Sequence, residues 1–146
     1  MKVDKADDGL TVRHVVFHSL SDAKAALEAG KPMSTSVSLC TARGAVRYAG
    51  PNYLIDVVRL AIVETGSRSD IETSALIDCR DEPALVFAAL RAGWQGIVYN
   101  GARSYRNEVE AAVAAHRATL LTRPPRALDL LDVPDPIAAC RKWYAR

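Results

Sequence analysis

The chain contains 146 residues, with 19 basic and 17 acidic side chains and a net charge of +2. This length suits one domain that buries roughly two-thirds of its unfolded surface, so neither disulfides nor a metal is needed to keep it folded. The nearly balanced charge argues against a dedicated nucleic-acid-binding surface, because no stretch concentrates Lys and Arg among aromatic residues.

The sequence also argues against export and membrane insertion. It has no apolar run near the roughly 18 residues of a membrane-spanning helix, and its first residues lack the apolar core of a signal peptide. Three cysteines, Cys40, Cys79 and Cys140, form no CxxC pair, which is typical of reduced thiols. We therefore predict a cytoplasmic protein that binds neither membranes nor nucleic acid.

The order of helix and strand signals predicts one α/β domain. Residues 1–12 are expected to form a disordered leader, and residues 13–146 the domain. In chain order the predicted elements of the first half are a strand at 14–18, a helix at 23–29, a strand at 34–41, a loop at 42–51 and a helix at 52–65. Ser19 to Asp22 can cap the first helix, and Gly30 can end it.

The second half continues the alternation. Its predicted elements are a strand at 74–79, a helix at 84–92, a strand at 95–99, a helix at 105–117, a strand at 118–122 and a helical tail at 134–144. Pro83 suits the first turn of its helix, and Gly93 suits the end of that helix. We interpret the basic residues at 123–126 and 141–146 as solvated surfaces, and Trp94, Trp143 and Tyr144 as packing or interface residues.

Five strands separated by helices predict a mainly parallel sheet with helical crossovers. Two architectures fit this pattern, a doubly wound, flavodoxin-like sheet and half of a (β/α)8 barrel. Both place functional residues at the carboxyl ends of the strands. Asp78 and Cys79 follow the third predicted strand, and Asn100 follows the fourth.

Three segments resemble the class II, metal-dependent fructose- and tagatose-bisphosphate aldolases. Residues 44–54, GAVRYAGPNYL, are similar to the family's G-A-x-x-Y-x-G loop and helix, and residues 75–79, ALIDC, to its His-Leu-Asp-His strand. Residues 90–101, LRAGWQGIVYNG, are similar to the family's A-G-F-x-S-V-M-I-D-G strand, and Asn107 falls near its Glu-Asn position. The resemblance covers roughly residues 16–122 and implies the first half of a barrel.

The resemblance also implies that the metal site is degenerate. The family's catalytic acid/base corresponds to Asp78, but Cys79 stands in place of the next metal-binding histidine, and Leu76 in place of the histidine two positions before the aspartate. The family's Asp-Gly-Ser appears as residues 100–102, Asn-Gly-Ala, and its Glu-x-Glu segment has no counterpart at 120–124. We therefore expect no bound metal and no cofactor.

The candidate residues admit two interpretations. Asp78 can act as a general acid/base at the end of a buried strand, or it can cap the next helix. Cys79 can be a ligand-binding thiol or a small buried side chain. Arg43 and Arg103, with Arg80 and Arg123, can form an anion-binding rim, and Gly44, Asn100 and Gly101 are further candidate ligand-binding residues.

Together these patterns predict a non-catalytic, aldolase-like α/β domain that acts as a binding or interaction module, with a small anion as its candidate ligand. The alternative is a small lyase or aldolase-like enzyme that uses Asp78. Because a half barrel leaves sheet edges and an apolar inner face open, we expect self-association into a homo-oligomer, or coverage by the tail at 134–144.

Overall fold

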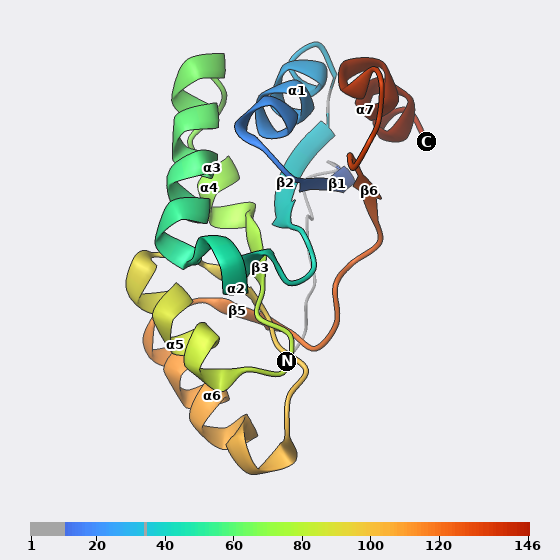
Figure 1. The fold of residues 1–146 in the computed structure, drawn as a ribbon. Coiled ribbons are helices and arrows are strands. Elements are labelled where there is room, and N and C mark those ends of the chain that lie inside the picture. Colours follow the sequence, from blue (N-terminus) through green and yellow to red (C-terminus); the bar gives the residue numbers. More distant parts are fainter. Residues whose placement is uncertain (1–10, 34) are drawn as a thin grey trace.

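The computed structural model describes residues 11–33 and 35–146. Within these residues the chain forms one six-stranded sheet and seven helices (Figure 1). The strands are β1 Thr11–Phe17, β2 Thr35–Thr41, β3 Leu76–Asp78, β4 Gly96–Val98, β5 Thr119–Leu121 and β6 Ala127–Asp129. The helices are α1 Leu20–Gly30, α2 Ala45–Ala49, α3 Pro51–Thr65, α4 Ile71–Ser74, α5 Pro83–Ala92, α6 Arg103–Ala115 and α7 Pro136–Tyr144.

The strands lie in the order β5-β4-β3-β2-β1-β6, and every neighbouring pair is parallel. The α/β fold with a parallel sheet and helical crossovers is therefore confirmed, but the predicted number of five strands is wrong. The sixth strand, β6, has only three residues and pairs with β1 from His14–Ala127 to Val16–Asp129. Its formation depends on this distant edge rather than on a local sequence signal.

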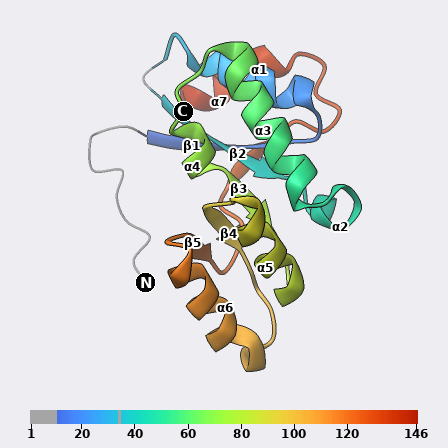
Figure 2. The ribbon, with the colours of Figure 1, turned by 90° about the vertical axis from the view of Figure 1, so that its left-hand side faces the viewer.

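The helices pack against one another on the outer face of the sheet in the row α7, α1, α3, α5, α6 (Figures 1 and 2). Three of the four predicted helix signals lie where they were expected, but Gly30 is the last residue of α1 rather than the residue after it, and Lys31 is the C-cap. The Asp22 N–H donates to Ser19 Oγ at 3.1 Å and caps α1. Pro83 occupies the first turn of α5, and Gly93 ends that helix in a left-handed conformation.

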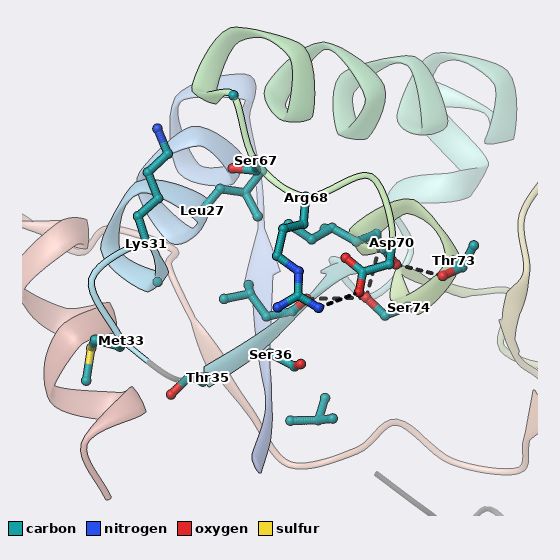
Figure 3. A pocket seen from close by; sticks show the side chains of 15 residues that line it. Leu27, Lys31, Met33, Thr35, Ser36, Ser67, Arg68, Asp70, Thr73 and Ser74 are labelled. Atoms are coloured by element: carbon teal, nitrogen blue, oxygen red, sulfur yellow. Dashed lines mark hydrogen bonds and ion pairs between the residues drawn. The ribbon is translucent and has the colours of Figure 1, made fainter. Parts of the chain in front are cut away.

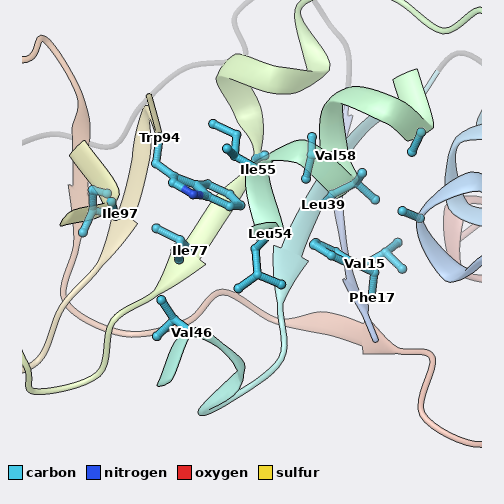
Figure 4. Packing of buried hydrophobic residues seen from close by; sticks show 14 of the residues in the cluster. Val15, Phe17, Leu39, Val46, Leu54, Ile55, Val58, Ile77, Trp94 and Ile97 are labelled. Atoms are coloured by element: carbon cyan, nitrogen blue, oxygen red, sulfur yellow. The ribbon is translucent and has the colours of Figure 1, made fainter. Parts of the chain in front are cut away.

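The main core lies between these helices and the outward side of the strands (Figure 4). Its largest member, Trp94, is 1% exposed and lies among Ile55, Ile77 and Ile97 in Figure 4. Its ring N–H donates to the Pro51 carbonyl at 3.0 Å, so the indole's polar atom is partnered. The expectation that Trp94 is a packing residue is confirmed.

A second, smaller apolar cluster occupies the inner face of the sheet, against which none of the described helices packs. It consists of Cys40, Leu76 and Val98, with Val16 and Leu121 beside it. Each alternates along its strand with a residue of the main core, as side chains of a strand do. The five neighbouring strands β1 to β5 therefore contribute one residue each to a band across the inner face.

The sheet is strongly curved. Five residues, 122–126, join the end of β5 at one edge to the start of β6 at the other. An extended chain of this length spans roughly 20 Å, whereas a flat six-stranded sheet would separate its outer strands by about 24 Å. The curvature brings the two edges toward each other, as Figure 1 shows.

Several predicted boundaries need correction. Residues 42–51 are not all loop, because residues 45–49 form α2, and α4 forms in the stretch between the predicted helix at 52–65 and β3. Thr11 and Val12, which the sequence places in the leader, belong to β1. Residues 1–10 of the predicted leader, and Ser34 of the predicted second strand, lie outside the described residues.

Candidate functional site

Hydrogen bonds from backbone N–H groups join the loops at the carboxyl edge of the sheet. The Asp78 N–H donates to Thr41 Oγ1 at 2.9 Å, which joins the ends of β3 and β2. The Asn100 N–H donates to the Arg80 carbonyl at 2.6 Å, which joins the loop after β4 to the loop after β3. The predicted site residues that follow β3 and β4 therefore lie at one edge and on neighbouring loops.

Asp78 serves this loop structure. Its side chain is half-buried, and Asp78 Oδ1 accepts the backbone N–H of Arg80 at 3.0 Å. Arg80 has a φ of 53°, a left-handed conformation that a non-glycine residue adopts only with local support. The carboxylate supplies such support to the loop, but it does not cap the next helix as the sequence allowed, because the N-cap residue of α5 is Glu82.

Cys79 is fully buried in the main core, beside Asp78 in sequence but not at the surface of the site. Burial, with the nearby negative charge of Asp78, raises the pKa of the Cys79 thiol to about 12. Burial likewise raises the pKa of Cys40 to about 12. Neither thiol is ionised at neutral pH, so neither can act as a nucleophile there.

The histidines do not converge with these cysteines. Cys40 Sγ lies 3.9 Å from His14 Nδ1, whereas His18 Nε2 lies 2.6 Å from Asp129 Oδ1 and braces β1 against β6. In the part of the chain that the structure describes, no group of three or more His, Cys, Asp and Glu side chains is arranged to hold a metal ion.

The predicted rim residues differ in their surroundings. Arg43 is exposed, and Gly44 begins α2 with a φ of 81°, a conformation that favours glycine. Asn100 and Arg103 are exposed on either side of Gly101, and Arg103 is the first residue of α6. The structure therefore groups Asn100, Gly101 and Arg103 at one helix start, while Arg43 and Gly44 belong to the loop after β2.

The strongest polar feature of this edge is Tyr99, which the sequence did not indicate. Tyr99 is 4% exposed, and its hydroxyl is buried without a hydrogen-bond partner among the described residues. Gly101 covers it so closely that a Cβ at that position would lie 2.1 Å from the Tyr99 oxygen. Burial, then the negative charge of Asp81, raises the Tyr99 pKa, so the hydroxyl remains a donor at neutral pH.

The helix that follows is open at its start. α6 has no side-chain cap at Ala102 and no acidic residue in its first turn, while Arg103 and Arg106 lie on that turn. The first N–H groups of a helix carry partial positive charge and need acceptors. A buried hydroxyl, a helix start without a side-chain cap and two arginines thus occur together at the loop between β4 and α6.

A cavity of about 390 Å³ lies at the opposite, amino edge of the sheet (Figure 3). Residues from the end of α1, the start of β2 and the segment from Gly66 to Ser74 line it. Arg68 and Asp70 form an ion pair of 2.9 Å on its wall, and Ser74 Oγ donates to the Val37 carbonyl at 3.3 Å. Arg68, Asp70 and Ser74 are therefore partnered, and the cavity holds none of the predicted site residues.

The chain matches no model of a known protein family and no curated protein. Among the described residues, none of the helices is both long enough and apolar enough to cross a membrane.

Proposed function

We propose that this chain is a non-catalytic binding module that holds a small anion, of the phosphate class, at the loop between β4 and α6. The observation that carries the proposal is the buried Tyr99 hydroxyl, which meets no acceptor among the described residues. Leaving such a donor without a partner costs about 1–3 kcal/mol. An anion that accepts from this hydroxyl would recover that cost.

The charges around the loop favour an anion over a neutral ligand. Arg103 and Arg106 lie on the first turn of α6, whose N–H groups add partial positive charge. Arg80 lies on the adjacent loop, joined to Asn100 by a hydrogen bond. The negative charges of Asp81 and Glu108 raise the Tyr99 pKa and oppose the binding of an anion. The ligand must therefore be selected by paired hydrogen bonds from the arginine guanidinium groups, and not by net charge alone.

The alternative, a lyase that uses Asp78, receives less support. The carboxylate of Asp78 accepts the Arg80 N–H and stabilises the turn, while Cys79 is buried and protonated. A general base needs access to the proton that it removes. This environment supports a structural role for Asp78 and a binding role for the edge.

We also propose that the domain is a half-barrel related to the class II aldolases. Strands β1 to β5 lie side by side in sequence order, with helices along one face, as in consecutive units of a (β/α)8 barrel. A flavodoxin-like sheet would reverse direction after its first strands, in the order 2-1-3-4-5. The sequential strand order supports the barrel-like alternative.

The three cysteines are free thiols, which is compatible with a cytoplasmic location.

Self-association is part of this proposal. The tail helix α7 packs beside α1 and β1, where it extends the outer helix row rather than covering the inner face. β5 and β6 each pair with one neighbour, so both sheet edges are available to a second copy. Light scattering coupled to size exclusion should give a dimer mass at micromolar concentration; a monomer at all concentrations would contradict this expectation.

Titration with inorganic phosphate tests the binding function. We expect saturable binding that weakens about tenfold or more in R103Q, because one guanidinium contact to a charged ligand is worth about 1.5–3 kcal/mol. The control is R91Q, an equal change of charge at the exposed end of α5. Equal weakening in both variants, or no saturation at low ionic strength, would contradict the proposal.

The D78N variant separates binding from catalysis. We expect D78N to retain phosphate binding, and neither it nor the natural chain to cleave a sugar bisphosphate. Turnover by the natural chain that disappears in D78N, with binding and thermal stability unchanged, would instead establish the lyase.

A further inference from the structure

Three arginine side chains converge on one tryptophan. The guanidinium carbons of Arg13, Arg126 and Arg146 lie 5.6, 5.6 and 5.8 Å from the centroid of the Trp143 ring. These residues meet because α7 packs beside β1, and β6 pairs with β1 (Figure 1). We call these three arginines and Trp143 the arginine cluster.

Within the described residues, the cluster holds three positive charges, and only the main-chain oxygen of Arg146 accepts a hydrogen bond from one of them. Each guanidinium lies within 5.8 Å of the same ring centroid, so the three charges are separated by distances comparable to the Debye length of about 8–10 Å. The ion pairs formed within the described part of the chain include none of these arginines. Their mutual repulsion is therefore only partly screened, and an anion between them would relieve it.

An acidic side chain beside the cluster is already engaged. Asp129 lines the space on one side of Trp143, but its Oδ1 accepts from His18 at 2.6 Å and from the Leu131 N–H at 2.9 Å. These bonds direct the carboxylate toward the ends of β1 and β6. Asp129 therefore leaves the arginine cluster with a surplus of donors.

Arg13 contributes an unmet donor of its own. Its Nη2 donates to the main-chain oxygen of Arg146, but its Nε is buried and has no acceptor among the described residues. Trp143 is held in place, since its ring N–H donates to the His14 carbonyl at 3.1 Å. The fixed ring gives the guanidinium groups a common support, so the cluster is organised in the absence of a ligand.

Two cavities adjoin the cluster and share Arg126, Trp143 and Arg146. One, of about 430 Å³, is also lined by Val12, Arg13 and His14. The other, of about 360 Å³, is also lined by Lys142 and by residues of β6 and α7. Both volumes fall within the range of small-molecule sites.

We propose that the arginine cluster is a second ligand site, which binds a small anion with two or more negative charges, of the phosphate ester or pyrophosphate class. Guanidinium groups pair with phosphate oxygens through two parallel hydrogen bonds, and several forks around one space suit several phosphate oxygens. Because guanidinium groups already surround the indole, the ring is a support for cations rather than a stacking platform for a nucleobase. This proposal does not depend on the site at α6.

Isothermal titration of the full chain with inorganic pyrophosphate tests the proposal. We expect saturable binding that weakens about tenfold or more in R126Q and less than about twofold in R141Q. Arg141 is the matched control, since it is exposed on α7 but is not a member of the cluster. Pyrophosphate binding should also persist in R103Q, which separates this site from the one at α6.

Trp143 reports on the same event by fluorescence. Pyrophosphate should change the tryptophan emission of the natural chain, and W143F should lose that change because Trp94 is buried in the core. Equal weakening in R126Q and R141Q would overturn the proposal in favour of general charge attraction. The absence of saturable pyrophosphate binding would also overturn the proposal. The same holds if a single-stranded oligonucleotide binds more tightly than pyrophosphate and its affinity falls equally in R126Q and R141Q.

Discussion

Replacing Tyr99 by phenylalanine should stabilise the free protein while weakening its binding of phosphate. The Tyr99 hydroxyl is buried, has no partner among the described residues, and lies against Gly101. A donor in that state costs about 1–3 kcal/mol, and phenylalanine keeps the ring and its packing without the hydroxyl. We therefore expect Y99F to raise the free energy of unfolding by about 1 kcal/mol, or the melting temperature by roughly 3–4 °C.

With phosphate present, the natural chain should become more stable than Y99F. A ligand that binds only the folded state adds stability according to its concentration relative to Kd, and the natural chain should gain more than Y99F. Urea unfolding with and without phosphate measures both effects in one series. Y105F is the matched control, because the Tyr105 ring is 52% exposed on the first turn of α6, and its loss of a hydroxyl should change stability by less than about 0.5 kcal/mol.

The result that would refute this reasoning is a loss of stability. If Y99F lowers the free energy of unfolding by 1 kcal/mol or more, then the Tyr99 hydroxyl has a hydrogen-bond partner in solution and does not need a ligand as its acceptor. Equal stabilisation of both proteins by phosphate would separately remove Tyr99 from the binding site.

Three further predictions follow from buried and paired groups. The Cys40 and Cys79 thiols should not react with a disulfide reagent at pH 7–8 until the chain unfolds, because burial raises both pKa values to about 12; rapid labelling of the native protein would contradict this. Burial opposes ionisation of Asp129, but hydrogen bonds from the Leu131 N–H and from His18 outweigh burial and lower the Asp129 pKa. The ionised carboxylate therefore contributes to stability above its ordinary pKa, and this contribution is lost as the pH falls through the lowered pKa. D129N should therefore lower the free energy of unfolding by about 0.5–1 kcal/mol at pH 7 and by little below that value, and a difference independent of pH would count against the charge effect. G96A should cost about 1–3 kcal/mol in a thermal melt, since its Cβ would lie 2.6 Å from the carbonyl oxygen of Ala75, the residue directly before β3; a cost under 0.5 kcal/mol would mean that β3 and β4 separate easily.

The alternation of strands and helices was predictable because its signals are local. Ser19 caps α1, Pro83 starts α5 and Gly93 ends it, each through the chemistry of its own residue. β6 was not predictable in this way. Three residues after two prolines carry no clear strand signal, and they form a strand because the edge of β1 lies beside them.

The candidate site also has one part that could be predicted from the sequence and one part that could not. Asn100, Gly101 and Arg103 follow a predicted strand and precede a predicted helix, so their place at the carboxyl edge could be read from the chain. The importance of Tyr99 could not be predicted, since it depends on how closely the loop at Gly101 covers the hydroxyl. A tyrosine at the end of a strand has no pattern that distinguishes a partnered hydroxyl from an unpartnered one.

The arginine cluster shows why the interpretation of basic runs as solvated surfaces was incomplete. Arg126 and Arg146 belong to two separate runs, and Arg13 stands alone in a strand more than a hundred residues earlier. The pairing of β6 with β1 and the packing of α7 beside β1 bring them to one indole. Charge that is dispersed along the sequence thus becomes concentrated in space, and repulsion among the three cations gives a polyvalent anion its advantage there over water.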